Sequence, residues 1–195
     1  MIASLADRCV SFMVQRGVFN NTEEQREIYS YGMELQIHYI INAVLLLALG
    51  FFFGRFLEVA FFLFLFGLMQ SNGGGYHANT HGRCLGIMAC GVLLFLVLLP
   101  LYQYNVRLQF FSALIGFISV IWLAPVAHKN HPLNPEKSKR MGRRAKVLAV
   151  TILIAWCLIH FVEMWQIVNS IVSLTMAFIS VSMVAAQIKK LKNDA

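Results

Sequence analysis

Apolar residues along this chain come in long stretches that short polar segments separate. Six stretches are close to the length at which a helix crosses a bilayer, at residues 37–54, 56–70, 85–101, 108–127, 147–163 and 168–186. A helix satisfies its own backbone hydrogen bonds in lipid, so apolar runs of this kind predict transmembrane helices. The expected fold class is therefore all-α, a polytopic membrane protein with about six transmembrane helices.

The residues ahead of these stretches follow a different pattern. Near one face of a helix over residues 1–20 lie Ile2, Leu5, Cys9, Phe12 and Met13. This spacing predicts an amphipathic helix, which either lies on a membrane surface or packs against the rest of the protein. Thr22 and Gln25 form a capping box, which predicts a second helix that continues into the first span.

The whole chain, residues 1–195, is expected to form a single integral-membrane domain. Within it, residues 1–36 would form cytoplasmic or interfacial helices, residues 37–186 a six-span bundle, and residues 187–195 a cytoplasmic tail. The first two spans meet at Gly54-Arg55, so a tight hairpin is expected there.

Composition supports a membrane protein over a soluble one. Hydrophobic residues make up 58% of the chain and charged residues 13%, whereas soluble domains have about 25% charged residues. A soluble fold of this composition would expose large apolar patches, which favour aggregation. The lipid bilayer is therefore an expected partner, and we expect no nucleic-acid partner and no cofactor.

The basic residues predict an orientation in the membrane. Most of the 16 Lys and Arg residues lie at 129–146 and in the C-terminal tail, and basic loops stay in the cytoplasm. With six spans, both termini and the loop at residues 71–84 are then cytoplasmic. Only Arg55 and Arg107 fall on the outer side. The expected location is the cell membrane.

The loop SNGGGYHANTHGRC differs from the rest of the chain, because it combines three glycines with two histidines and a cysteine. Cys84 is expected at the N-terminus of the third span. There the helix dipole and Arg83 both favour the nucleophilic thiolate over the neutral thiol. His77 could act as the general base. Seven residues of continuous helix would separate the pair by about 10 Å, so the chain must break at Gly82 or around it.

Supporting residues for such a thiol site are expected close by. Candidates for orienting the histidine, or for stabilising an oxyanion together with backbone N–H groups of the third span, are Gln70, Asn72, Gly75, Asn79 and Arg83. Two alternatives stay open: His77, His81 and Cys84 could bind a zinc ion, or the histidines could be purely structural. A non-enzymatic transporter is a further alternative, although no ionisable group lies at the centre of a span.

This loop resembles the signature of the accessory gene regulator protein B (AgrB) family. The matching residues are Gly74-Gly75-Tyr76-His77-Ala78, followed by Cys84 seven residues after the histidine. Tyr31-Gly32 and Glu34 upstream, and Pro125, Asn130 and Pro132 downstream, also resemble the family. The arginine that the family commonly has ahead of the glycines is replaced here by Gln70-Ser71-Asn72.

The resemblance implies a cysteine endopeptidase of Gram-positive quorum sensing, with Cys84 as the nucleophile and His77 as the acid/base, and no metal. Such an enzyme cuts a precursor peptide (AgrD) on its C-terminal side through a thioester. A Cys or Ser of the peptide then displaces the enzyme, giving a thiolactone or lactone. The resemblance also implies a homodimer.

The basic loop could have a second role beyond orientation. By resemblance the precursor has an acidic C-terminal segment, and the loop residues that could attract it are Lys129, Lys137, Lys139, Arg140, Arg143 and Arg144. Cys90 and Cys157 lie inside apolar spans and are expected to be small buried hydrophobic residues.

Overall fold

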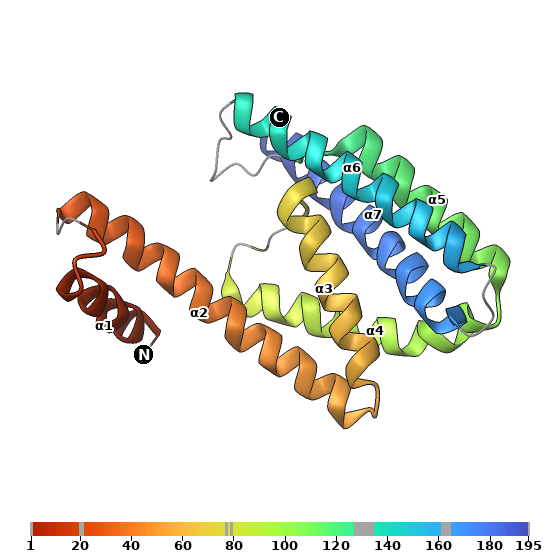
Figure 1. Ribbon diagram of the computed structural model, residues 1–195, viewed down its shortest axis with the longest axis horizontal. Coiled ribbons are helices and arrows are strands. Elements are labelled where there is room, and N and C mark those ends of the chain that lie inside the picture. The colour runs from red at the N-terminus through yellow and green to blue at the C-terminus, as the bar shows by residue number, and fades with distance from the viewer. Residues whose placement is uncertain are drawn as a thin grey trace. The chain divides into compact units, whose positions relative to one another are not determined.

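The computed structural model describes residues 2–19, 22–76, 78, 80–126, 135–160 and 165–194. Over these residues the chain forms seven α-helices and no strand (Figure 1). The helices are α1 (Ile2–Gln15), α2 (Glu23–Phe52), α3 (Phe56–Gly73), α4 (His81–Gln103), α5 (Val106–Leu123), α6 (Pro135–His160) and α7 (Gln166–Asp194). The predicted all-α fold class is confirmed.

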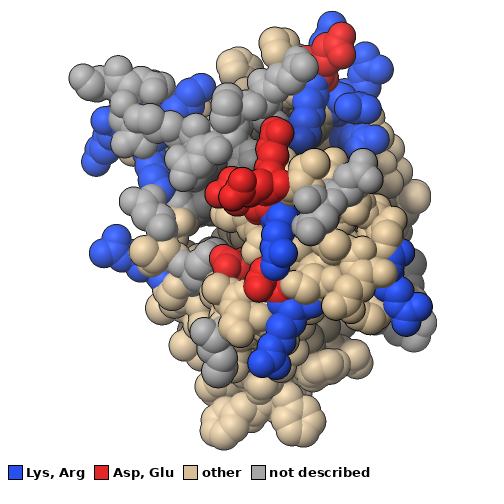
Figure 2. Space-filling view, turned by 90° about the vertical axis from the view of Figure 1, so that its left-hand side faces the viewer, with Lys and Arg blue, Asp and Glu red and all other residues tan. Residues whose placement is uncertain are grey.

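Each predicted span overlaps one helix over most of its described residues. Among the described residues, α2, α3, α4, α5 and α7 are the five helices that are long and apolar enough to cross a membrane. In α6 the apolar sequence begins only after Lys146, and the described part of the helix ends at His160. Its described apolar part is therefore shorter than those of the other five helices. The surface is also mostly uncharged: in Figure 2, residues other than Lys, Arg, Asp and Glu cover most of the described surface in view.

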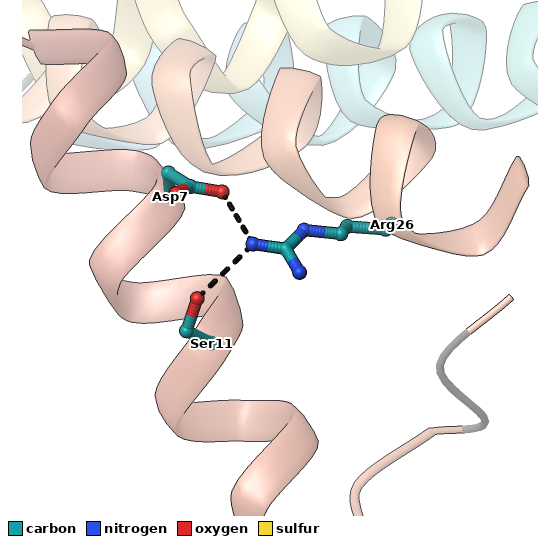
Figure 3. Close-up of polar contacts among 3 residues, drawn as sticks. All are labelled: Asp7, Ser11 and Arg26. Atoms are coloured by element: carbon teal, nitrogen blue, oxygen red, sulfur yellow. Dashed lines mark hydrogen bonds and ion pairs between the residues drawn. The ribbon is translucent and has the colours of Figure 1, made fainter. Parts of the chain in front are cut away.

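Residues 1–49 form one compact unit. Ala6 and Val10 of α1 are fully buried, while Leu5 and Phe12 are exposed, so the predicted N-terminal helix packs within the protein on one side. The Arg26 guanidinium of α2 donates to Asp7 Oδ1 at 2.9 Å and to Ser11 Oγ at 3.2 Å (Figure 3).

The predicted start of α2 is confirmed. Thr22 Oγ1 accepts a hydrogen bond from the Gln25 N–H at 3.4 Å, ahead of a helix that begins at Glu23. This cap satisfies one of the N–H groups that the first turn of a helix leaves without a partner.

Residues 50–195 form a second unit, in which α7 packs against α3, α4, α5 and α6. Figure 1 shows α5 and α6 running alongside α7. In the core the Phe62 ring of α3 stacks on the Phe95 ring of α4, with centroids 4.4 Å apart, and meets Phe178 of α7 at 5.4 Å. α7 is therefore the central helix of this unit.

The expected hairpin at Gly54-Arg55 is also confirmed. Gly54 has a φ of +65° between the end of α2 and the start of α3, a left-handed conformation that glycine adopts at little cost. Arg55 Nη1 donates to Glu58 Oε1 at 2.9 Å, which places both charges at this turn.

One expectation is wrong. Cys90 and Cys157 are exposed on the surface of the chain instead of being buried in its interior. An apolar stretch that crosses a bilayer has a face toward lipid as well as one toward other helices, and hydropathy alone does not distinguish the two.

Candidate active site

The loop that carries the predicted chemistry begins where α3 ends. Gly74 has a φ of +74°, and its N–H donates to the Gln70 carbonyl at 3.0 Å. A Cβ atom at this position would collide with the Val126 carbonyl oxygen. Only glycine fits both the left-handed backbone and the close approach of the second segment.

That second segment connects α5 with α6. The Val126 N–H donates to the Gly73 carbonyl at 2.9 Å, so the two segments share a backbone hydrogen bond. A Cβ on Gly142 of α6 would lie 2.8 Å from Pro125 Cδ. The turn at residues 73–75 (the glycine turn) is thus hydrogen-bonded to the α5–α6 connection, and this connection packs closely on α6.

Tyr76 is held by residues from two helices. Its N–H donates to Ser182 Oγ of α7 at 3.0 Å, and its carbonyl accepts from Gln70 Nε2 of α3 at 3.2 Å. Lys189 Nζ lies 5.0 Å from the centroid of the Tyr76 ring, within range of a cation–π interaction. The chain is therefore fixed immediately before residue 77.

Cys84 lies in the first turns of α4. The helix is N-capped by Thr80, whose Oγ1 accepts from the Arg83 N–H at 3.3 Å and whose carbonyl accepts from the Cys84 N–H at 3.0 Å. The Cys84 side chain is half-buried. Its predicted position at the start of this helix is confirmed.

The break that a Cys–His pair requires lies just before α4. Thr80 has an extended backbone (φ −134°, ψ 149°), and residues 74–76 are also outside any helix. Gly82 itself is helical, so the break falls ahead of that glycine. The helix that carries Cys84 therefore begins only at His81. His77 and Asn79 lie outside the described residues, as does the His81 side chain.

The other supporting candidates differ in what they contact. Asn72 Nδ2 donates back to the Leu68 carbonyl at 2.8 Å, so this amide is turned along its own helix. Gln70 instead reaches the loop at Tyr76. Gly75 has no room for a side chain, because a Cβ there would lie 2.8 Å from Ser182 Oγ. Arg83 is exposed beside Cys84.

An open groove of about 490 Å³ begins at this loop and follows one face of α4. It is lined by Tyr76, Ala78, Arg83, Gly86, Ile87, Cys90 and Lys189. Cys84 is the neighbour of Arg83 in the first turns of the same helix. The groove combines an apolar wall with two cationic side chains, one from α4 and one from α7.

The basic residues of α6 lie at its N-terminal half. Five of the six predicted substrate-binding residues are described and exposed: Lys137, Lys139, Arg140, Arg143 and Arg144. Lys129 lies outside the described residues. The same part of α6 contains Gly142, which packs on Pro125, so the basic half of α6 contacts the α5–α6 connection that is bonded to Gly73.

Sequence reasoning missed Ser182, Lys189 and Val126. Ser182 is 106 residues from the Tyr76 N–H that it accepts, and no local pattern in the sequence pairs them. The three consecutive glycines indicated only backbone freedom, not that another segment packs against them.

Taken together, the fold and the loop define a polytopic α-helical membrane protein. A cysteine lies at the N-terminus of one of its helices, and hydrogen bonds from other segments hold the glycine-rich loop ahead of that helix. The family model of accessory gene regulator B matches residues 6–188, and the chain belongs to this family. Membership places the protein in the accessory gene regulator system.

Two relatives from Clostridium perfringens agree with this assignment. AgrB-like protein 2 of strain 13 (type A) is 29% identical over 156 residues, covering 76% of this chain and 70% of the relative. An AgrB-like protein of strain SM101 (type A) is 27% identical over 163 residues, covering 78% and 76%. No solved structure matches the chain.

Proposed function

We propose that this protein is a membrane cysteine endopeptidase that cleaves an AgrD-like precursor peptide for a cyclic quorum-sensing signal. The observation that carries the proposal is the break ahead of α4. Because α4 begins only at His81, after an extended Thr80, no continuous helix imposes the separation of about 10 Å that would keep the histidine from the thiol. Cys84 is the nucleophile and His77 the acid/base in this proposal.

The reaction follows from these two groups. His77 takes the thiol proton, and the Cys84 sulfur attacks the scissile carbonyl carbon. The tetrahedral intermediate collapses as the C–N bond breaks, and His77 returns the proton to the leaving amine. The N-terminal fragment stays attached as a thioester. A Cys or Ser side chain of that fragment then attacks the thioester, which closes the ring and releases Cys84.

Backbone N–H groups at the start of α4 are the candidates for stabilising the oxyanion. The cap at Thr80 uses the N–H groups of Arg83 and Cys84. Helix geometry leaves the first N–H groups without intrahelical partners, so we assign the oxyanion to the N–H groups of His81 and Gly82. Both sit at the positive end of the helix dipole.

The substrate is proposed to lie along the groove that starts at Tyr76 and Ala78 and continues past Arg83. The exposed basic half of α6 attracts the acidic segment of the precursor. The catalytic loop and both termini face the cytoplasm, where the precursor is made, and the enzyme acts as a homodimer.

The test is cleavage of the precursor encoded with this protein, followed by mass spectrometry in liposomes. Wild type should release the C-terminal fragment, and Cys84→Ala and His77→Ala should not. Absence of cleavage by wild type with its cognate precursor would contradict the proposal. If chelators abolish activity and thiol alkylation does not, the metal site of His77, His81 and Cys84 is the better account.

A further inference from the structure

Two side chains from different helices hydrogen-bond to the backbone of Tyr76, the residue directly before His77. On one side Ser182 Oγ accepts from the Tyr76 N–H at 3.0 Å, and on the other Gln70 Nε2 donates to the Tyr76 carbonyl at 3.2 Å. The carbonyl of Tyr76 belongs to the same planar peptide group as the N–H of residue 77. Ser182 therefore fixes the peptide group ahead of Tyr76 and Gln70 fixes the one behind it, so the two bonds together set the direction in which the backbone leaves Tyr76.

The two side chains that bond Tyr76 also pack closely on the neighbouring Gly75. A Cβ on Gly75 would lie 2.8 Å from Ser182 Oγ and 3.3 Å from Gln70 Cγ. Both side chains thus pack on the same glycine, and a larger residue at position 75 would displace them from the Tyr76 backbone. The Lys189 ammonium over the Tyr76 ring, one more contact from α7, restrains the side chain as well.

Ser182 differs from the other serines of α7 in its hydrogen-bond partner, which lies in the loop between α3 and α4. Ser170 and Ser173 donate to carbonyls of their own helix, and Ser180 pairs with Ser119 of α5. These bonds join helix to helix or stay within one helix. Ser182 alone among the four reaches the loop that precedes the acid/base residue.

We propose that Ser182 is a positioning residue of the active site, which acts through the Tyr76 backbone to hold His77 in reach of Cys84. The inference rests on the proposed endopeptidase function. A reacting group displaced by about 1 Å can lower a rate by about 100-fold. Loss of the Ser182 hydroxyl should therefore affect mainly the chemical step, because Tyr76 is only one of the residues that line the proposed substrate groove.

The experiment compares Ser182→Ala and Ser182→Thr with Ser180→Ala as the matched control. Ser180 is two residues away, 8% exposed, and its hydroxyl lies 2.6 Å from that of Ser119, so its substitution also removes one hydrogen bond of α7. For each variant in liposomes, kcat, KM and the thermal midpoint are measured with the cognate precursor.

We expect Ser182→Ala to lower kcat by about 10-fold to 100-fold with KM within twofold of wild type. Ser182→Thr, which keeps the hydroxyl, should retain most of kcat, and Ser180→Ala should leave kcat nearly unchanged. If Ser182→Ala is too unstable, Ser182→Cys replaces it, since a thiol is a weak acceptor of similar size.

Equal kcat values for Ser182→Ala and Ser180→Ala would overturn the positioning role, as would a loss confined to KM or to the thermal midpoint. Failure of wild type itself to cleave would instead remove the proposed function. The two failures are therefore distinguishable in one set of measurements.

Discussion

At the scale of single residues, the glycines of the loop have different tasks. Gly74 provides a left-handed backbone against Val126, and Gly75 provides space for Ser182 and Gln70. The sequence indicated the freedom of these glycines but not their opposing residues. Those residues come from α7 and the α5–α6 connection, far along the chain, and contacts at such separations leave no periodic signal.

Gly74→Ala should abolish cleavage, because it adds both backbone strain of roughly 1–2 kcal/mol and a collision with the Val126 carbonyl. Gly54→Ala is the matched control, since Gly54 has a φ of +65° with nothing within 4 Å of its Cβ position. Cleavage assays and thermal midpoints of both variants are compared. Equal loss of activity in the two would show that strain alone matters, contrary to this account.

At the scale of elements, local sequence predicted most of the structure. Hydropathy located the helices, and Thr22 and Gln25 predicted the start of α2. The exposure of Cys90 and the central place of α7 were not predictable, because they depend on which helix faces meet. The break before α4 was expected near Gly82, yet the cap at Thr80 places it slightly earlier.

Thr80→Ala should destabilise the first turn of α4 by about 1 kcal/mol and lower kcat, because that turn carries Cys84. Asn105→Ala provides the comparison. It removes the equivalent cap of α5, where Asn105 Oδ1 accepts from the Leu108 N–H at 3.1 Å. Both variants should lose similar stability in thermal unfolding, while only Thr80→Ala loses kcat. Similar kcat losses would argue against a catalytic role for the α4 terminus.

At the scale of the whole molecule, charge determines orientation and substrate attraction in this account. The exposed cations of α6 lie on the half of this helix that contacts the connection bonded to the glycine turn, and the groove beside that turn adds Arg83 and Lys189. Hydropathy predicted a membrane protein, while the sidedness that the basic residues indicate stays a prediction. Neither pattern could predict that α6 and α7 both contact the segments that build the loop.

Charge reversal at Lys137, Lys139 and Arg140 should raise KM for the precursor and change its dependence on salt, with kcat little altered. Reversal of Lys190 and Lys192 in the tail is the control for net charge. Initial rates at several salt concentrations make the comparison. An unchanged KM would leave these α6 residues with a role in orientation only.

A C-terminal alkaline phosphatase fusion should be inactive, and a fusion at Arg55 active, because that enzyme folds only outside the cytoplasm. The opposite pattern would place the loop of residues 71–84 outside and remove its access to a cytoplasmic precursor. Immunoblotting of both fusions checks that each chain is produced.

Whether Cys84 carries the peptide as a thioester can be measured by intact-protein mass spectrometry with a modified precursor. Replacing the ring-forming Cys or Ser of the precursor by Ala prevents displacement, so the intermediate should accumulate. We expect a protein heavier by the N-terminal fragment, with the adduct mapped to Cys84, sensitive to hydroxylamine and absent in Cys84→Ala. Cleavage without an adduct, or an adduct on Cys90, would contradict it.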